Sequence, residues 1–380
     1  MCTPPIKNNG FPDTRLSSLD GLRGVAILLV IGYHYFNEPG ALRVSLYPYG
    51  DAFAGFPLFV YGFLGVHLFF IISGFVIALT LDKCKTPYEF FVRRFARIWP
   101  PLLVCSIITF LIIKLFPSPF SAVRKYDWSD FLPSLTLTPN ELWSWHFPNV
   151  DFVDGVYWTL LVEARFYLIV AVIYWSFRRA NIARNLVIFT FLNIFCRAAL
   201  QRALPGSNEI YSALFVPDFM PWFAAGAVFY ELYTNRIRIT FAIVLLCLMI
   251  AIIFRISTFG FNGVSELNPL IISCFAILFF AMFFLIATKS TIARFFEAGP
   301  LMWVGVCSYS VYLLHYAIGM TILTSIPKGV AIASQFTLIV TVAITMITAG
   351  YLSFTYVEKP SRRFVTRIML INRLRIRSIS

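Results

Sequence analysis

Long apolar runs recur along the chain, separated by shorter segments that hold most of the charges. The runs are continuously apolar, and a helix of about 20 such residues crosses the ~30 Å hydrocarbon core of a bilayer with its backbone hydrogen bonds satisfied internally. They therefore predict an all-α, polytopic membrane protein with about ten transmembrane helices. The expected spans are residues 22–36, 58–80, 98–116, 156–176, 185–204, 210–231, 237–254, 268–288, 301–323 and 331–356.

Most Lys and Arg residues outside these spans fall in alternate connections. They gather before the first span, after every second span and after the last, and few lie in the other connections. Cytoplasmic loops carry such an excess of basic residues, so we expect both termini in the cytoplasm. The expected organisation is a cytoplasmic segment at 1–19, a transmembrane domain at 20–360 and a basic cytoplasmic tail at 361–380.

The composition supports this picture, with 59% hydrophobic residues, 13% charged residues and a net charge of +13. Basic clusters beside apolar helices typically contact anionic headgroups, so the charge predicts membrane lipids as partners and no nucleic acid. Residues 1–19 lack the continuous apolar run of a secretory signal, which favours a retained first helix. The seven cysteines show no CxxC spacing, which predicts free thiols and no metal site.

The longest connection, residues 117–155, is expected on the outer side and holds Trp128, Trp143 and Trp145. Connections of this length are usually functional or disordered. The tryptophans either stack on sugar rings or form an aromatic belt at the membrane interface, and the sequence leaves both interpretations open.

Two ionisable residues, Arg23 and His34, lie in the first predicted helix. They are eleven positions apart, which is close to three helical turns and about 16 Å along the axis, so they share one helix face. Ionisable groups are costly inside a bilayer, and each is a functional candidate. The alternative is that Arg23 reaches back to the surface and His34 hydrogen-bonds a neighbouring helix.

Three further titratable residues, His67, Glu163 and His315, lie at similar depth in other spans. Several such groups at one depth predict a polar cavity inside the bundle. Histidine suits general base catalysis because its ordinary pKa of about 6.5 lets it take and return a proton near neutral pH. A carboxylate such as Glu163 is a candidate to orient or stabilise the protonated ring of His34.

Arg93, Arg94 and Arg97 precede the third span, within residues 90–101. Arg94 and Arg97 are three positions apart and are neighbours on one face if the helix begins early. Guanidinium groups hold phosphate bidentately, so the pair suits a phosphorylated donor. A cytoplasmic excess of basic residues explains the same cluster equally well.

These residues belong to a series of motifs that resembles the integral-membrane acyltransferase family 3. The motifs are LDGLRGVAILLVIGYH at 19–34, GVHLFFIISGFVI at 65–77, RRFARIWPP at 93–101, VYWTLLVEARFYL at 156–168, YSVYLLHYAI at 309–318 and VEKPSRRF at 357–364. They occur in order over nearly the whole chain.

The resemblance implies about ten helices and an O-acyltransferase, which moves an acyl group, usually acetyl from acetyl-CoA, to a hydroxyl of a carbohydrate. Cell-surface or secreted polysaccharides and glycolipids are acceptors of this class. The resemblance makes Arg23 and His34 the essential pair of the first helix, assigns Arg94 and Arg97, with Arg93 beside them, to the donor phosphates, and marks Glu163 as a further functional acid.

Two positions depart from the family pattern. The position of His67 is often acidic or an amide in the family, so no role transfers to it. The histidine matched by His315 is often followed closely by proline, whereas Tyr316 and Ala317 follow it here.

The resemblance favours a bacterial inner membrane as the location. Many members carry an additional soluble domain after the helices, and because this sequence ends at residue 380 we expect it to work alone, as a homo-oligomer or with a biosynthetic partner. Two other functions stay open at this point: acylation of a secreted small molecule, such as a lipochitooligosaccharide or a macrolide, and proton-coupled secondary transport. Transporters commonly contain internal repeats, and none is evident between 1–190 and 191–380.

Overall fold

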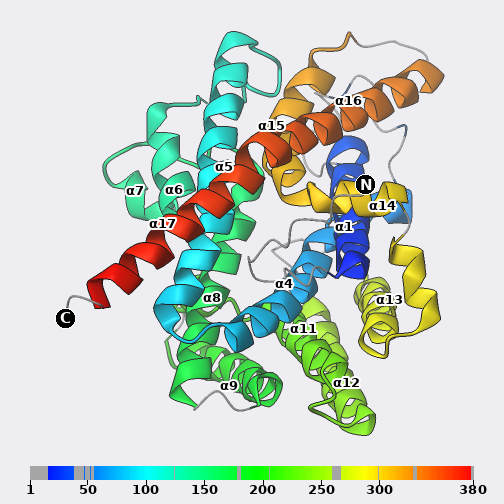
Figure 1. The fold of residues 1–380 in the computed structure, drawn as a ribbon. Helices are drawn as coiled ribbons and strands as arrows, with labels where there is room; N and C mark the ends of the chain where they lie inside the picture. Colours follow the sequence, from blue (N-terminus) through cyan, green and yellow to red (C-terminus); the bar gives the residue numbers. More distant parts are fainter. Residues whose placement is uncertain are drawn as a thin grey trace, which may run out of the picture.

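A computed structural model of the chain describes residues 16–37, 47, 52, 55–123, 125–177, 181–204, 206–258, 267–297, 299–327 and 332–377. All regular elements within these residues are helical (Figure 1). The long helices are α1 (Ser17–Phe36), α4 (Leu64–Lys83), α5 (Pro87–Leu115), α8 (Trp158–Ser176), α9 (Ile182–Ala203), α11 (Met220–Tyr233), α12 (Ile239–Thr258), α13 (Pro269–Ala287), α15 (Ser308–Thr324), α16 (Ile332–Ser353) and α17 (Lys359–Arg377).

Shorter elements connect the long helices. They are α3 (Pro57–Val60), η1 (Trp128–Asp130), α6 (Phe131–Thr136), α7 (Glu141–Ser144), η2 (Gly155–Tyr157), α10 (Asn208–Phe215), η3 (Thr291–Glu297), α14 (Gly299–Val306) and the π-helix η4 (Phe354–Glu358). Most of the predicted segment 1–19, and residues 378–380 of the predicted tail, lie outside the described residues.

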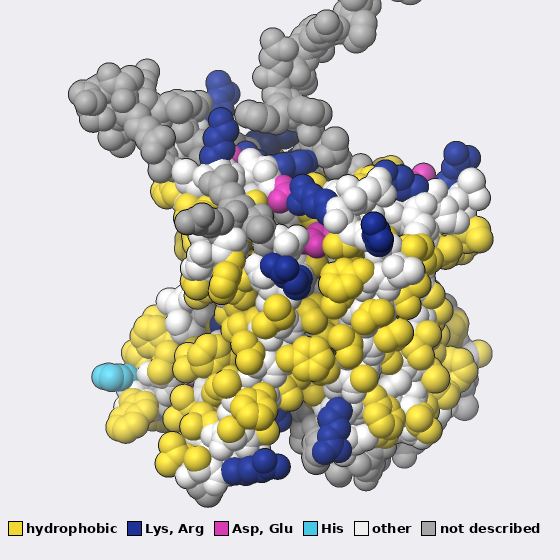
Figure 2. All heavy atoms as spheres, turned by 90° about the horizontal axis from the view of Figure 1, so that it is seen from below, with side chains coloured by type: hydrophobic (Ala, Val, Ile, Leu, Met, Phe, Trp, Pro, Cys, Tyr) yellow, Lys and Arg dark blue, Asp and Glu magenta, His cyan; other side chains and the backbone are white. Residues whose placement is uncertain are grey.

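The predicted class is confirmed. Among the described residues, nine helices are long and apolar enough to cross a membrane, and the pair α14 and α15, bent by 74°, makes a tenth when counted as one span. On the face shown in Figure 2, hydrophobic side chains form a broad band, with Lys and Arg side chains gathered mainly above the band and a few below it. The six cysteines described are free, as their spacing predicts.

Helix α4 forms the centre of the bundle, where it packs against α1 and α11. Its contact with α11 is close because Gly74 faces the backbone of Phe223 and Gly226 faces the backbone of Ile71, with no room for a Cβ atom at either glycine. Small residues allow this approach in membrane helices, where packing rather than water drives association. The tight centre holds the outer helices α1, α8 and α15 around one interior space.

Helix α5 begins at Pro87, eleven residues before the predicted start at 98, and this boundary prediction was wrong. The true start has strong local signals, because Thr86 caps the helix by accepting a hydrogen bond from the backbone N–H of Glu89, and Pro87 occupies the first helical turn. A search for apolar runs misses this start because Glu89 and three arginines, at 93, 94 and 97, interrupt the apolar pattern. The early start places Arg94 and Arg97 inside a helix.

Two other expected spans also differ from the structure. The span at 210–231 corresponds to one candidate span, Ile210–Tyr233, but its helix is interrupted at Val216, whose φ of 43° ends α10 before α11 begins. Pro217 disfavours helical backbone at the residue before it. The last helix does not end at 356, because α16 continues through η4 into α17, which packs along α5. Residues 361–377 of the predicted tail are therefore helical.

The contact between α1 and α14 provides a stability test. A Cβ atom at Gly305 of α14 would overlap the backbone carbonyl of Asp20 in α1, whereas nothing lies within 4 Å of a Cβ at Gly299 of the same helix. Gly305→Ala is expected to destabilise the fold by about 1–3 kcal/mol through overpacking. Gly299→Ala is the matched control. Equal thermal midpoints of the two variants in detergent, followed by tryptophan fluorescence, would contradict this packing.

Candidate functional site

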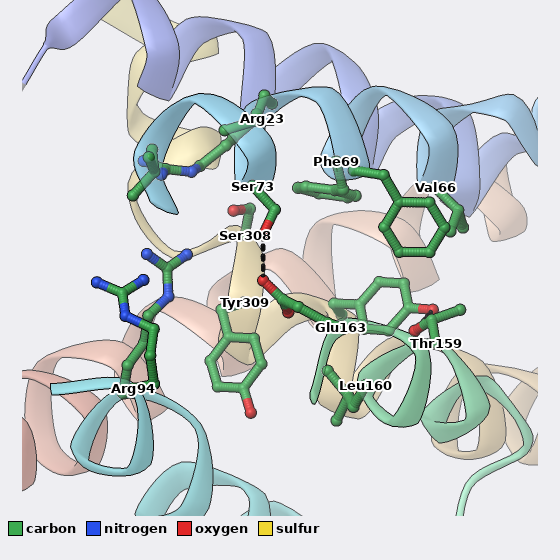
Figure 3. A pocket seen from close by; sticks show the side chains of 15 residues that line it. Arg23, Val66, Phe69, Ser73, Arg94, Thr159, Leu160, Glu163, Ser308 and Tyr309 are labelled. Carbon is green, nitrogen blue, oxygen red and sulfur yellow. Dashed lines mark hydrogen bonds between the residues drawn. The ribbon is translucent and has the colours of Figure 1, made fainter. Parts of the chain in front are cut away.

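Helices α1, α4, α5, α8 and α15 enclose a cavity with about 640 Å³ of empty space, part of which is open to solvent. Its charged lining consists of Arg23 from α1, Arg94 and Arg97 from α5, and Glu163 from α8. In Figure 3 the arginines lie at one end, apolar side chains including Val66 and Phe69 lie at the other, and Glu163 lies between them. The cavity therefore has a cationic end and an apolar end.

The arginine side chains are held in place by neighbouring groups. Arg94 is buried, donates a hydrogen bond of 2.8 Å to the hydroxyl of Thr80, and lies over the ring of Tyr167 at 5.8 Å. Arg23 forms an ion pair of 2.6 Å with Asp20, three residues earlier in α1. Three guanidinium groups and one carboxylate line the cavity, so the cationic end suits an anionic ligand.

Arg93 faces elsewhere. It forms an ion pair of 2.8 Å with Glu89 on the same helix, and it is not among the residues that line the cavity. Of the three arginines predicted to hold phosphate, the structure brings two together at the cavity. The three-residue spacing of Arg94 and Arg97 accounts for that pairing.

Glu163 is held by two hydroxyl groups. Its Oε1 atom accepts a hydrogen bond of 2.7 Å from Ser73 in α4, drawn in Figure 3, and one of 2.6 Å from Tyr167 in α8. These donors orient the carboxylate from two helices. Neither is a histidine, so the contacts seen here do not include the predicted pairing of Glu163 with His34.

His34 lies in a separate aromatic cluster. Its ring centroid is 5.3 Å from that of His315 and 4.4 Å from that of Tyr316. His315 is fully buried, and its Nδ1 lies 2.8 Å from the carbonyl oxygen of Tyr312. A carbonyl only accepts hydrogen bonds, so this contact assigns the proton of the neutral ring to Nδ1 and leaves Nε2 as an acceptor.

Tyr312 connects the cavity to this cluster. It lines the cavity, and its ring centroid is 5.4 Å from that of His315. Its hydroxyl lies 2.8 Å from that of Thr159 and 3.1 Å from the carbonyl oxygen of Val156, which fixes the ring. The contacts thus run in series from the cavity through Tyr312 and His315 to His34, which does not itself line the cavity.

His67 lies apart from both groups. Its ring is buried against aromatic side chains, including Trp222 at 4.9 Å between ring centroids and Phe219 at 5.7 Å. It does not line the cavity. Of the four titratable residues whose similar depth predicted a polar cavity, Glu163 lines this one, and His34, His67 and His315 do not. Arg23, Arg94 and Arg97 provide the rest of its charged lining.

Three residues at or near the site were not predicted from the sequence. Glu358 is buried in the π-helix η4, accepts a hydrogen bond of 2.8 Å from Ser310, and lies within electrostatic range of Arg97 and Arg23. It belongs to the VEKPSRRF motif, which was quoted for the resemblance without a role. The motif could therefore have identified Glu358 as a candidate site residue. Ser73 and Thr80, which bind Glu163 and Arg94 through their hydroxyl groups, are ordinary residues of an apolar helix, and nothing in the sequence distinguishes them.

A cysteine lies near the arginine end of the cavity. Cys84 is buried in the connection between α4 and α5, and burial raises the pKa of its thiol to about 11. The thiolate is the reactive form, so the raised pKa keeps this thiol protonated near neutral pH and lowers its reactivity there. Among the described residues, no cluster of three or more His, Cys, Asp or Glu side chains could hold a metal ion.

The comparison with known families agrees with the motifs. Residues 16–356 match the family described as an acyltransferase domain, acyltransferase family 3. The chain belongs to this family. Family 3 relatives include the peptidoglycan O-acetyltransferase OatA of Listeria monocytogenes, 26% identical over 91% of this chain and 56% of that protein. The O-acetyltransferase OatA of Staphylococcus aureus (strain NCTC 8325 / PS 47) is 24% identical over 92% of this chain and 57% of that protein.

The chain spans little more than half the length of these relatives, since it covers 56% of the Listeria protein and 57% of the Staphylococcus protein. No solved structure matches the chain. The family 3 assignment therefore rests on sequence, and the geometry above describes how the family's motifs come together in this chain.

The chemistry of Cys84 can be tested directly. A variant with Cys84 as its only cysteine is expected to react slowly with maleimide at pH 7, because a pKa near 11 instead of near 9 leaves roughly 100-fold less thiolate. The rate is expected to rise as the pH approaches 11. The same protein unfolded in detergent is the control, and equal rates for folded and unfolded protein at pH 7 would contradict the assignment.

Proposed function

We propose that this protein is a membrane O-acyltransferase that moves an acetyl group from acetyl-CoA to a hydroxyl of a carbohydrate. The observation that carries the proposal is a cavity that has three arginines at one end. Tyr312 lines this cavity and contacts His315, which in turn contacts His34. Membership of acyltransferase family 3 and the activities named for its relatives support the same reaction.

The donor binds with its phosphates at the cationic end of the cavity. Arg94 and Arg97 supply planar guanidinium groups that match phosphate oxygens, and Arg23 adds a third charge from α1. Arg93 is left out of this site because it is paired with Glu89. Because His34 does not line the cavity, the proposal requires the thioester end of the donor to extend past Tyr312, the lining residue that contacts His315, as far as the ring of His34.

His34 acts as the general base in a direct transfer. Its imidazole takes the proton of the acceptor hydroxyl while the hydroxyl oxygen attacks the thioester carbonyl carbon. The carbon–sulfur bond then breaks, and the leaving thiolate of CoA takes the proton from the imidazolium, so the products are an ester and free CoA. Such a base typically contributes a factor of 10² to 10⁴ to the rate.

The acceptor is a carbohydrate of the cell envelope, by the chemistry named for the relatives, one of which is called a peptidoglycan O-acetyltransferase. We place both termini in the cytoplasm on the distribution of basic residues. We place the protein in a bacterial inner membrane on its membership of family 3. The donor then enters from the cytoplasm and the acceptor from the outer side. Glycolipids and secreted small molecules are alternative acceptors, and the experiment below distinguishes them from wall glycan.

The test is acetyl-CoA turnover by purified protein in nanodiscs, with wall glycan fragments, extracted glycolipids and secreted small molecules supplied as separate acceptor pools. CoA release and ester formation are expected with a glycan pool. His34→Ala is expected to lower kcat at least ~100-fold, the loss typical of a missing general base.

The matched control is His146→Ala, because His146 is an exposed histidine in the outer connection. It is expected to retain the wild-type rate. Undiminished turnover by His34→Ala would remove the general-base role, and proton-coupled flux without any acyl-CoA dependence would identify a transporter.

A further inference from the structure

The connection between α5 and α8 returns to the bundle at Asp154, whose side chain is completely buried. One carboxylate oxygen accepts a hydrogen bond of 3.2 Å from the backbone N–H of Val156, within its own turn. The other accepts one of 3.0 Å from the backbone N–H of Ala317 in α15. The first bond caps η2, and the second ties the connection to a helix far away in sequence.

The same turn of α15 receives a second bond from this segment. The hydroxyl of Tyr157 donates 3.1 Å to the carbonyl oxygen of Leu313. Leu313 and Ala317 are four residues apart, which is the spacing of a helical donor and acceptor, and His315 lies between them. Asp154 and Tyr157 therefore engage both ends of the helical turn that carries His315.

Helix α1 holds this turn from the other side. The hydroxyl of Tyr35 donates a hydrogen bond of 2.7 Å to the carbonyl oxygen of His315, and Tyr35 follows His34 directly in α1. A Cβ atom at Gly155 would lie 3.0 Å from the ring of Tyr316, so the segment after Asp154 lies close to that ring. The ring of Tyr316 is tilted by 51° against that of His34, at 4.4 Å between ring centroids.

We propose that Asp154 is a positioning residue for acyl transfer, which fixes the turn of α15 so that His315 and Tyr316 lie against His34. This inference rests on the proposed function. A buried carboxylate is costly unless it is hydrogen-bonded, and each oxygen of Asp154 accepts a backbone N–H, one in its own turn and one in α15. Charge-assisted bonds to backbone N–H groups are stronger and better suited to hold a geometry.

The same connection offers a matched control. Asp130 is also buried, and its two carboxylate oxygens accept 3.1 Å hydrogen bonds from the backbone N–H groups of Asp127 and Asp151. These bonds stay within the connection and do not reach α15. Asp130→Ala therefore removes a similar pair of bonds, at a similar cost in stability, without releasing the turn that carries His315.

The experiment compares Asp154→Ala and Asp130→Ala in nanodiscs, with kcat and the donor KM measured alongside thermal stability. Asp154→Ala is expected to lower kcat at least tenfold while the donor KM stays within twofold, because the arginines that bind the donor lie beyond Tyr312. Asp130→Ala is expected to keep kcat within twofold. Should Asp154→Ala fail to fold, Asp154→Asn, which retains one acceptor oxygen and the volume, is expected to show the same pattern with a smaller loss.

Each other outcome overturns a specific statement. An equal loss of kcat in Asp130→Ala, a rise in the donor KM without a loss of kcat, or wild-type kcat in both Asp154 variants would reduce Asp154 to an anchor of the connection. In these cases the proposed function is still supported, provided that the wild-type protein turns over acyl-CoA and that His34→Ala does not. Absence of any acyl-CoA-dependent transfer by the wild-type protein overturns the proposed function itself.

Discussion

The structure depends on one constraint: every charged group inside an apolar bundle must find its partner within the protein. A charge at the centre of a bilayer costs at least about 2.5–3.5 kcal/mol on insertion scales. Arg23 meets this constraint with Asp20, Arg94 with Thr80, and Glu163 with Ser73 and Tyr167. These pairings fix the rotamers of the side chains around the cavity, so the requirement for partners also organises the site in advance.

The arginines and the histidines of the site lie in different places. The guanidinium groups lie at one end of the cavity, and the imidazoles lie behind Tyr312, whose own hydroxyl is fixed by Thr159. In the proposed mechanism, the groups that bind the donor phosphates are therefore distinct from the imidazoles that move the proton. The close contact of α4 with α11 and the bend between α14 and α15 bring the five helices near enough for this geometry.

The sequence predicted the fold class and the number of spans because continuous apolar runs leave few alternatives to a membrane helix. It also placed Arg94 and Arg97 together, since their spacing is local to one helix. It did not reveal that His34 contacts His315 rather than Glu163, or that Asp154 reaches Ala317, because both depend on packing between helices distant in sequence. The helix start at Pro87 was missed because an apolar pattern does not include the cap that precedes it. The interruption at Val216 was missed because the effect of a proline on the residue before it does not change the apolar pattern.

The separation of binding from chemistry is tested most directly by equilibrium binding of radiolabelled CoA to purified variants in nanodiscs. The account predicts that His34→Ala and Arg93→Ala bind CoA as tightly as the wild-type protein, whereas Arg97→Ala binds at least tenfold more weakly. Equal binding by Arg97→Ala and the wild-type protein, or loss of binding in His34→Ala, would contradict it.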